Sequence, residues 1–235
     1  MAATLLPTGA ARAATITLSA SKDNTLYEDP AGGLSNGAGP HFFVGRTNQG
    51  TGSIRRGLVA FDLSSVPAGA TITSATLTLS VTKTITLPTT IQLNRVVHSW
   101  GEGTSFTDPG GTGTFATTND ATWKHRFFSA TNWDNLGGDF VAVASASSAV
   151  NGLGAQTWSG PGLVSDVRAW LNTPASNCGW ELLGDESKIG TAYQFGTHEN
   201  AVASNRPSLS VTYTVPEPGS LGALGAVLVL AGRRR

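Results

Sequence analysis

Apolar and polar residues alternate along residues 72–81, whose sequence is ITSATLTLSV. Because successive side chains of a β-strand point to opposite faces, Leu77 and Leu79 share one face of this segment. Thr76 and Thr78 share the other face. The pattern predicts a strand with its leucines buried and its threonines exposed or facing a second layer.

The same two-residue period recurs along the chain, with turn-forming residues between the segments. Residues 56–63 are apolar on both faces, which predicts a central strand. The other predicted strands are residues 15–20, 42–45, 91–97, 140–146, 180–183, 193–195 and 209–214. We expect one sandwich core to bury Val59, Phe61, Leu77, Leu79, Leu93 and Val211.

One segment has a helical period instead. Its apolar stripe, within residues 162–173, consists of Leu163, Val167, Trp170 and Leu171. This spacing predicts a single short amphipathic helix that covers one end of the sandwich, with Trp170 in the core. Strand context places Trp180 in the core as well. The predicted fold class is therefore all-β: a single antiparallel β-sandwich, jelly-roll-like, with one short helix.

Composition narrows the class of protein. Charged residues make up 13% of the 235 residues, and the formal net charge is +0. Nucleic-acid binding needs a basic surface, so this balance argues against such a role. The single cysteine, Cys178, cannot form an intrachain disulfide, and we expect it to be a small core residue.

The N-terminal residues carry part of an export signal. The small residues on either side of Arg12 are typical of a signal-peptide cleavage region, but the preceding segment lacks a basic start and a long apolar run. Two interpretations are open: a signal-peptide remnant, favoured because the C-terminus also indicates export, or an ordinary N-terminal segment. The predicted division is a signal-peptide remnant at 1–13, one sandwich domain at 14–214 and a tail at 215–235.

The tail has three parts in a fixed order. They are the rigid stretch Pro216, Glu217 and Pro218, the apolar residues 221–231, and the basic cluster Arg233, Arg234 and Arg235. An apolar segment followed by basic residues is typical of a stop-transfer element whose arginines stay in the cytoplasm. As a short hydrophobic helix outside the domain, the roughly 18 residues of 215–232 would reach roughly 27 Å, just under the ~30 Å of a bilayer core. This length favours a temporary tether.

This order of parts resembles the PEP-CTERM sorting signal of Gram-negative bacteria that build extracellular polysaccharide. The resemblance implies export, an intermediate tethered to the inner membrane, and cleavage near Pro-Glu-Pro by exosortase, a membrane-embedded protease. Release to the cell surface or extracellular matrix would follow. The implied partners are an exosortase-type enzyme and, transiently, the inner membrane.

A second resemblance covers most of the domain. Its segments are DNTLYE (23–28), SNGAGPHFFVGR (35–46), RRGLVAFDLSSVPAGATITSATLTL (55–79), WGEG (100–103), ATW (121–123), SDVRAWLN (165–172) and FGTHENAVASNRPSLSVTY (195–213). In this order they resemble the DNRLRE, or disaggregatase-related, domain and the alginate-binding carbohydrate-binding modules. The resemblance implies a β-sandwich of bacterial and archaeal surface proteins, and adhesion or polysaccharide binding rather than catalysis.

The residues themselves give little sign of catalysis. The sequence has no Gly-x-Ser-x-Gly elbow, His-Glu-x-x-His helix or phosphate-binding loop. Spacing pairs none of the carboxylates available for glycoside hydrolysis, which include Glu102, Asp108, Asp120, Asp134 and Asp139. The histidines lack metal-ligand spacing and are expected in turns or at the surface: His41, His98, His125 and His198. We expect no catalytic residues and no required cofactor.

Glycan binding has more support, because tryptophan rings stack on sugar rings and carboxylates accept hydrogen bonds from hydroxyl groups. The glycan-binding candidates, all in the loop-rich residues 100–162, are Trp100, Glu102, Trp123, Trp133 and Trp158. The alternative is that these tryptophans are core residues or loop anchors.

Structural Ca²⁺ is a further possibility, since it binds carboxylate and amide oxygens. Such oxygens occur around Asn24 and Glu28, and around Asp185 and Glu186, but no spaced ligand motif is present.

Three functions are consistent with these patterns. The first is a non-catalytic exported surface or matrix protein with a polysaccharide-binding or structural role. The second is a dedicated carbohydrate-binding module, and the third is a small polysaccharide-active enzyme. Glycan-binding assays separate the first two, and product analysis with the same glycans tests the third.

Overall fold

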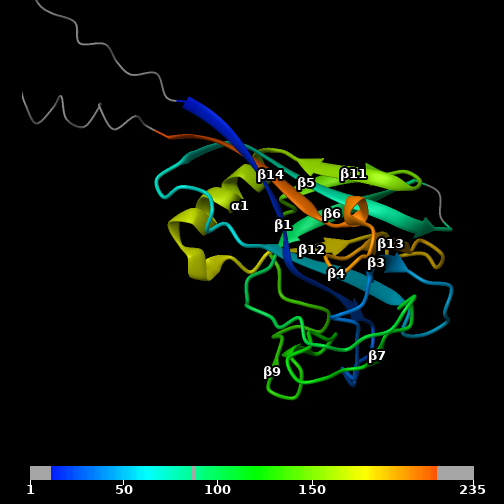
Figure 1. Ribbon diagram of the computed structural model, residues 1–235. Helices are drawn as coiled ribbons and strands as arrows, with labels where there is room; N and C mark the ends of the chain where they lie inside the picture. Colours follow the sequence, from blue (N-terminus) through cyan, green and yellow to red (C-terminus); the bar gives the residue numbers. More distant parts are fainter. Residues whose placement is uncertain (1–11, 86–87, 216–235) are drawn as a thin grey trace, which may run out of the picture.

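The computed structural model describes residues 12–85 and 88–215. Within them, one continuous antiparallel sheet folds into two packed layers, and a single α-helix lies at one end (Figure 1). The elements are β1 (Arg12–Tyr27), β2 (Leu34–Ser35), β3 (His41–Arg46), β4 (Ile54–Phe61), β5 (Thr71–Thr84), β6 (Thr89–Arg95), β7 (Thr114–Phe115), β8 (His125–Phe127), β9 (Thr131–Asn132), β10 (Ala146–Val150), β11 (Gly154–Ser159), α1 (Pro161–Asn172), η1 (Pro174–Ser176), β12 (Trp180–Leu183), β13 (Tyr193–Gly196), η2 (Ala203–Asn205) and β14 (Ser208–Val215). The predicted all-β sandwich with one short helix is confirmed, while the predicted C-terminal helix lies outside the described residues.

The first layer is built around β5. This strand pairs with β11 along one edge and with β14, then β13, along the other. Leu77 lies between Trp158 of β11 and Leu209 of β14 in register. Leu77 and Leu79 are buried while Thr76 and Thr78 are partly exposed, as the alternation predicted.

The second layer is built around β4. Strand β1 pairs with β4 along one edge, and β12 and the end of β3 pair with it along the other. Strands β6 and β10 extend the layer beyond β12. Buried residues on both faces of β4 confirm the prediction of a central strand.

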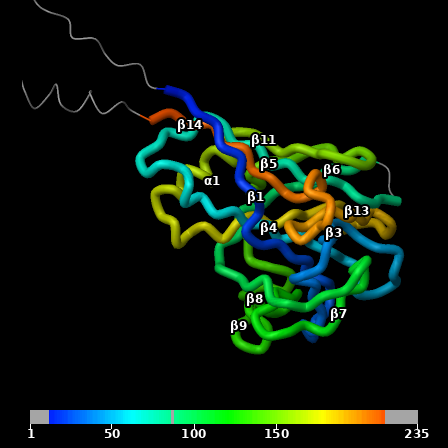
Figure 2. Tube along the Cα trace, viewed as in Figure 1, coloured from blue at the N-terminus to red at the C-terminus, as the bar shows by residue number. Residues whose placement is uncertain are grey.

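Strand β1 belongs to both layers. Residues 12–19 pair with β14, residues 20–27 pair with β4, and a register shift between Ala20 and Lys22 separates the two halves. The first residue, Arg12, pairs with Val215 at the end of β14, so the two ends of the domain lie side by side (Figures 1 and 2). β1 thus begins two residues inside the segment predicted as a signal-peptide remnant.

The main core fills the space between the two layers. The residues predicted for it are at most 1% exposed: Val59, Phe61, Leu77, Leu79, Leu93 and Val211. Trp180 is buried there as well, in agreement with its strand context.

A second apolar cluster lies under the long loops. It contains Leu26, Leu58, Ala60, Val96, Trp100, Ala121, Trp123, Trp133 and Cys178. Leu58 and Ala60 alternate with Val59 and Phe61 along β4, so the cluster covers the face of the second layer opposite to the main core. The loops around β7, β8 and β9 close it from outside, and we call residues 97–145 the loop layer (Figures 1 and 2). Cys178 is buried in this cluster, as predicted for a small core residue.

Two segments differ from the sequence prediction. Residues 140–146 do not form the predicted strand, and the strand at this place, β10, starts only at Ala146. The residues before it contact β6 through single hydrogen bonds, from Val141 N to Arg95 O and from Ser145 N to Leu93 O, and not through a continuous ladder. Conversely, β11 occupies residues predicted as loop and buries Trp158 against β5.

Helix α1 covers one end of the sandwich, as predicted. Its buried residues include Leu163, Val167 and Trp170, while Leu171 is partly buried against the main core. The Trp170 ring packs on the Trp180 ring with centroids 4.6 Å apart. Within the described residues, no helix combines the length and the hydrophobicity needed to cross a membrane.

Trp170 allows a test of how much this helix contributes to stability. We expect Trp170→Ala to lower the free energy of unfolding by about 3–5 kcal/mol, because it leaves a cavity beside Trp180. Trp170→Phe should lose less, since the buried Trp170 Nε1 has no hydrogen-bond partner in the described residues. Urea unfolding gives these values, with the exposed Ser165→Ala as a control within about 0.5 kcal/mol of the parent protein. A loss below about 1 kcal/mol for Trp170→Ala would contradict the core position.

Candidate functional site

A buried Asp–Asn pair near the end of β1 connects the sandwich to the segments around it. Asp23 and Asn24 are both 0% exposed. Because neighbouring strand residues point to opposite faces, the two side chains have different partners. The Asn24 amide donates to Ser35 Oγ and to the Glu102 carbonyl, both at 2.9 Å. Its Oδ1 accepts a hydrogen bond from Asn36 N at 3.3 Å, which fixes the loop after β2.

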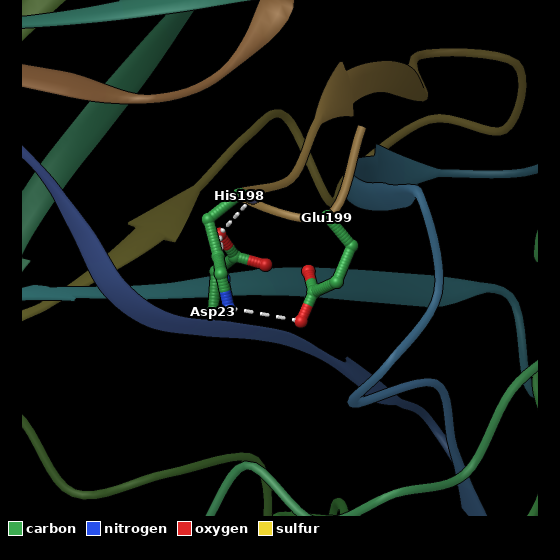
Figure 3. Close-up of side chains that lie close together, drawn as sticks. All are labelled: Asp23, His198 and Glu199. Atoms are coloured by element: carbon green, nitrogen blue, oxygen red, sulfur yellow. Dashed lines mark hydrogen bonds and ion pairs between the residues drawn. The ribbon is translucent and has the colours of Figure 1, made fainter. Parts of the chain in front are cut away.

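The other side chain, Asp23, faces the loop that follows β13. Asp23 Oδ2 accepts a hydrogen bond from His198 N at 2.9 Å and lies 3.3 Å from His198 Nδ1. Glu199 Oε1 lies 3.0 Å from His198 Nε2, on the other side of the imidazole ring (Figure 3). Glu102 Oε1 accepts a hydrogen bond from Asp23 N and lies 3.5 Å from His198 Nδ1. We call Asp23, Glu102, His198 and Glu199 the carboxylate–histidine cluster.

The loop that carries His198 and Glu199 is held by its neighbours. Thr197 Oγ1 donates to the Gly39 carbonyl at 2.8 Å, and Asn200 Nδ2 donates to the Pro40 carbonyl at 2.9 Å. These bonds fasten both ends of the His198–Glu199 pair to the segment before β3. The side chains of Glu102, His198 and Glu199 are 24%, 27% and 27% exposed, so the cluster opens to solvent on one side.

The electrostatics of the cluster follow from burial and from its hydrogen bonds. Burial raises the pKa of Asp23 to about 6 and that of Glu102 to about 7. The hydrogen bonds to Asp23 and Glu199 raise the pKa of His198 to about 10, so the imidazole is protonated at neutral pH. Three carboxyl groups thus surround a single cationic ring.

This combination of groups is chemically able to hold a metal ion. Asp23, His198 and Glu199 each offer one ligand atom, and these atoms lie within 4.8 Å of one another. A second group with this property contains His98, Asp134 and Asp139. In that group Asp139 already accepts hydrogen bonds from Asp134 N at 2.7 Å and Asn135 N at 2.9 Å, so its carboxylate caps a loop.

The tryptophans predicted to bind glycans are buried at 0–7% exposure: Trp100, Trp123, Trp133 and Trp158. Trp158 lies in β11 and donates to the Ile91 carbonyl at 2.9 Å. Trp100 and Trp133 anchor the loop layer by donating to the Cys178 and Thr122 carbonyls. In this conformation the rings pack as core residues and loop anchors. Their stacking on a sugar stays a prediction that would require the covering loops to open. Glu102 alone among the predicted glycan-binding residues keeps a partly exposed side chain.

The other predicted residues are mostly dispersed. The structure brings Asp134 and Asp139 together but places Glu102 in the carboxylate–histidine cluster. Of the oxygens considered for Ca²⁺, Glu28 Oε2 accepts from Ser53 N at 2.7 Å and Asp185 Oδ1 accepts from Ser187 N at 2.9 Å. Calcium at those two places stays a prediction. The residues of the tail, Pro216 to Pro218 and Arg233 to Arg235, lie outside the described residues.

Sequence reasoning missed the partners of His198. Asp23 and His198 are 175 positions apart, so no spacing rule connects them. The one local signal is that Asp23 and Asn24 are consecutive polar residues inside a stretch that forms a buried strand.

A second buried carboxylate lies on β12, beneath the loop layer. Glu181 is 0% exposed, and Arg56 Nη1 approaches its Oε1 only to 3.7 Å. Neither carboxylate oxygen of Glu181 has a hydrogen-bond partner among the described residues. Arg56 instead makes a two-pronged contact with Glu186, at 2.7 and 3.0 Å. Burial therefore raises the pKa of Glu181 well above its ordinary value.

Comparison with known proteins identifies the tail. Residues 214–235 match the family described as the PEP-CTERM protein-sorting motif. This motif indicates an exported protein that exosortase, a membrane protease, processes from a membrane-anchored intermediate. The predicted sorting motif is thereby confirmed. A comparison of the whole chain with curated proteins finds no match.

Glu181 gives a prediction for stability against pH. A carboxyl group whose pKa is raised by folding stabilises the fold below its unfolded pKa, about 4.3, and loses this contribution as pH rises toward the folded pKa. Glu181→Gln keeps the group neutral at all pH values, and Arg56 keeps Glu186 as its partner. We therefore expect Glu181→Gln to be more stable than the parent near pH 8. The difference should shrink toward pH 4, by at most about 1.4 kcal/mol per pH unit.

Urea unfolding at several pH values measures this difference. Glu186→Gln is the matched control. It also removes the charge of a carboxylate that contacts Arg56, but Glu186 is partly exposed whereas Glu181 is buried. If Glu181→Gln were less stable than the parent at every pH, the Arg56–Glu181 contact would be net stabilising and the prediction would be wrong.

Proposed function

We propose that this chain is a non-catalytic surface or extracellular-matrix protein. It is tethered temporarily by its PEP-CTERM tail, released by exosortase, and binds or organises extracellular polysaccharide. The observation that carries the proposal is the match of residues 214–235 to the sorting motif, behind a disulfide-free β-sandwich. A sandwich of this kind, once released, can act as a binding or structural unit without a catalytic centre.

The arrangement of the domain is consistent with the resemblance on which the polysaccharide part of the proposal rests. Segments on which the resemblance to the DNRLRE domain rests meet at the Asp23–Asn24 pair. Asn24 bonds to Ser35 and Glu102, and Asp23 bonds to His198. Residues from four separate segments of the resemblance therefore contact one another. Such contacts are expected if proteins of this kind share the segments because their common fold requires them.

A surface hollow offers one place for a sugar. It has a volume of about 250 Å³, and its lining includes Phe43, Lys83, Pro109, Tyr193 and Gln194. Its wall is mainly apolar and also carries the Gln194 amide and the Lys83 ammonium group, which is the mixture found in small-molecule binding pockets. The exposed Lys83 would favour an acidic polysaccharide over a neutral one.

Glycan binding is tested with the processed protein purified from the medium of its host. We expect affinity gels that contain acidic polysaccharide, such as alginate, to retard it more than gels with neutral glycans. Lys83→Ala should weaken the retardation, whereas Lys124→Ala, in the loop layer, should not change it. Absence of retardation on every gel would leave a structural role without glycan binding. Release of shortened products from the same glycans would favour an enzyme instead.

Processing is tested by the intact mass of the secreted protein. We expect the mature chain to lack everything after about Pro218, because prolines disfavour helix in the preceding residue and a protease commonly binds its substrate as an extended strand. Replacing Pro216 and Glu217 should trap the full-length form in the membrane. Neutral residues in place of Arg233, Arg234 and Arg235 should weaken retention and sorting.

Two outcomes contradict this prediction. One is a full-length chain ending in Arg235 in the extracellular fraction. The other is normal release from a strain that lacks its exosortase.

A further inference from the structure

The carboxylate–histidine cluster has buried oxygens without donors. Asp23 Oδ1 and Glu199 Oε2 are inaccessible to solvent, and neither has a hydrogen-bond partner among residues 12–85 and 88–215. Asp23 is 0% exposed, and its free oxygen points toward the Glu199 carboxylate (Figure 3). A buried carboxylate oxygen without a donor is costly, so such oxygens usually indicate a missing partner.

No side-chain cation near the cluster supplies this partner. His198 is the only basic group in ion-pair contact with Asp23, Glu102 or Glu199 among the described residues. Its ring nitrogens are directed to Asp23 Oδ2, Glu102 Oε1 and Glu199 Oε1 rather than to the two free oxygens. The nearby Lys22 extends away, over the Trp100 ring at 4.1 Å. Three carboxyl groups against one imidazole leave room for further positive charge.

We propose that Asp23, His198 and Glu199 form a binding site for a divalent transition-metal cation of the Zn²⁺ type, with Glu102 at its rim. The donor set is one imidazole nitrogen and several carboxylate oxygens, which Zn²⁺ accepts and which Ca²⁺, with its preference for oxygen alone, does not favour. Because the imidazole is protonated at neutral pH before an ion binds, the ion replaces the proton on the ligating nitrogen, and that proton is released to solvent. The spacing of the named ligands is compatible with one ion. Ligand atoms around a tetrahedral zinc ion lie roughly 3.3–3.5 Å apart at Zn–N and Zn–O distances near 2.1 Å. Glu199 Oε1 lies 3.0 Å from His198 Nε2, and one ligand atom from each of Asp23, His198 and Glu199 lies within 4.8 Å of the other two, so small side-chain movements bring them to this spacing.

The ligands are held in place before any ion binds. Asp23 is fixed by the β1–β4 ladder, in register with Val59. Thr197 and Asn200 fasten the loop on either side of His198 and Glu199. Glu102 is held by its hydrogen bond from Asp23 N at 2.7 Å. Preorganised ligands of this kind lose little conformational freedom when a metal ion binds.

The second group of potential ligands does not meet the same criteria. The Asp134 and His98 side chains are 80% and 41% exposed. Asp139 is buried, but both of its oxygens accept hydrogen bonds from the 134–135 backbone. The group of His98, Asp134 and Asp139 therefore serves as the matched comparison. It has a similar combination of residue types but no buried oxygen without a hydrogen-bond partner.

A metal ion in the cluster would cross-link three segments distant in sequence: β1, the loop that contains Glu102 and the loop after β13. The chain has a single cysteine, Cys178, which is free. Within the described residues no disulfide links these segments, so the ion would join them as a disulfide does in other proteins. Such an ion would stabilise the domain whether or not the protein binds polysaccharide.

The test uses the untagged full-length chain, stripped with a chelator and then dialysed free of it. Isothermal titration with Zn²⁺ should give a stoichiometry near one ion per chain, and Zn²⁺ should raise the melting temperature more than Ca²⁺ or Mg²⁺ at equal concentration. Co²⁺ should give the visible absorption band of a tetrahedral site with a nitrogen ligand. Glu199→Gln should weaken Zn²⁺ binding at least about tenfold, the loss that even supporting residues of metal sites cause. Glu199 is partly exposed, and its one ion pair among the described residues is with His198, so this variant should fold.

Asp134→Asn, in the second group, is the control and should leave the affinity unchanged. His198→Gln should abolish the Co²⁺ band while circular dichroism reports a folded sandwich. The proposal is overturned if the folded parent chain binds no Zn²⁺, or if Asp134→Asn rather than Glu199→Gln lowers the affinity. Binding of Ca²⁺ in preference to Zn²⁺ at the same residues would overturn the assignment of the metal class.

Discussion

Strand β1 forms backbone hydrogen bonds with strands of both layers, and the arrangement of the domain depends on this double pairing. Its first half completes the ladder with β14 and its second half completes the ladder with β4. The register shift between Ala20 and Lys22 separates the two halves, so one strand pairs with β14 in the first layer and with β4 in the second. Directly after this shift come Asp23 and Asn24, which point to opposite sides and connect β1 to the loop after β13 and to the loop layer.

The two sides of the second layer are stabilised by different kinds of interaction. Between the layers, burial of aliphatic and aromatic side chains dominates, and the rings of Trp170 and Trp180 pack together where α1 meets the sheet. Beneath the loop layer the apolar cluster is smaller, and buried polar groups such as Asn24 and Glu181 share the space. Loops without regular structure must find partners for their backbone groups, and the side chain of Asn24 supplies several of them. The polar contacts of this region are therefore part of the fold as well as part of the candidate site.

The sequence predicts the fold better than the site. Strong alternation around Leu77 and the helical stripe around Trp170 reflect burial on one face, so both elements are found where they were expected. Strand β11 was missed because its glycine, alanine and hydroxyl residues resemble a loop. For the indoles of the loop region the sequence leaves sugar binding and a core or anchor role both open, because nothing local shows that a loop layer can enclose its own apolar cluster. The carboxylate–histidine cluster depends on residues 175 positions apart, and only the folded chain brings them together.

The pairing of Arg12 with Val215 has a mechanical consequence for the tethered intermediate. The tail continues from the end of β14, whereas the loop layer lies near the far end of β1, a contour length of roughly 50 Å for a strand of its 16 residues. If a partner pulls on the loop layer while the tail holds the chain, the load passes along β14. This strand is bonded to β1 on one edge and to β5 on the other. The force therefore acts on both ladders in shear, and many hydrogen bonds share it at once, so β14 resists detachment more than a strand peeled from one end would.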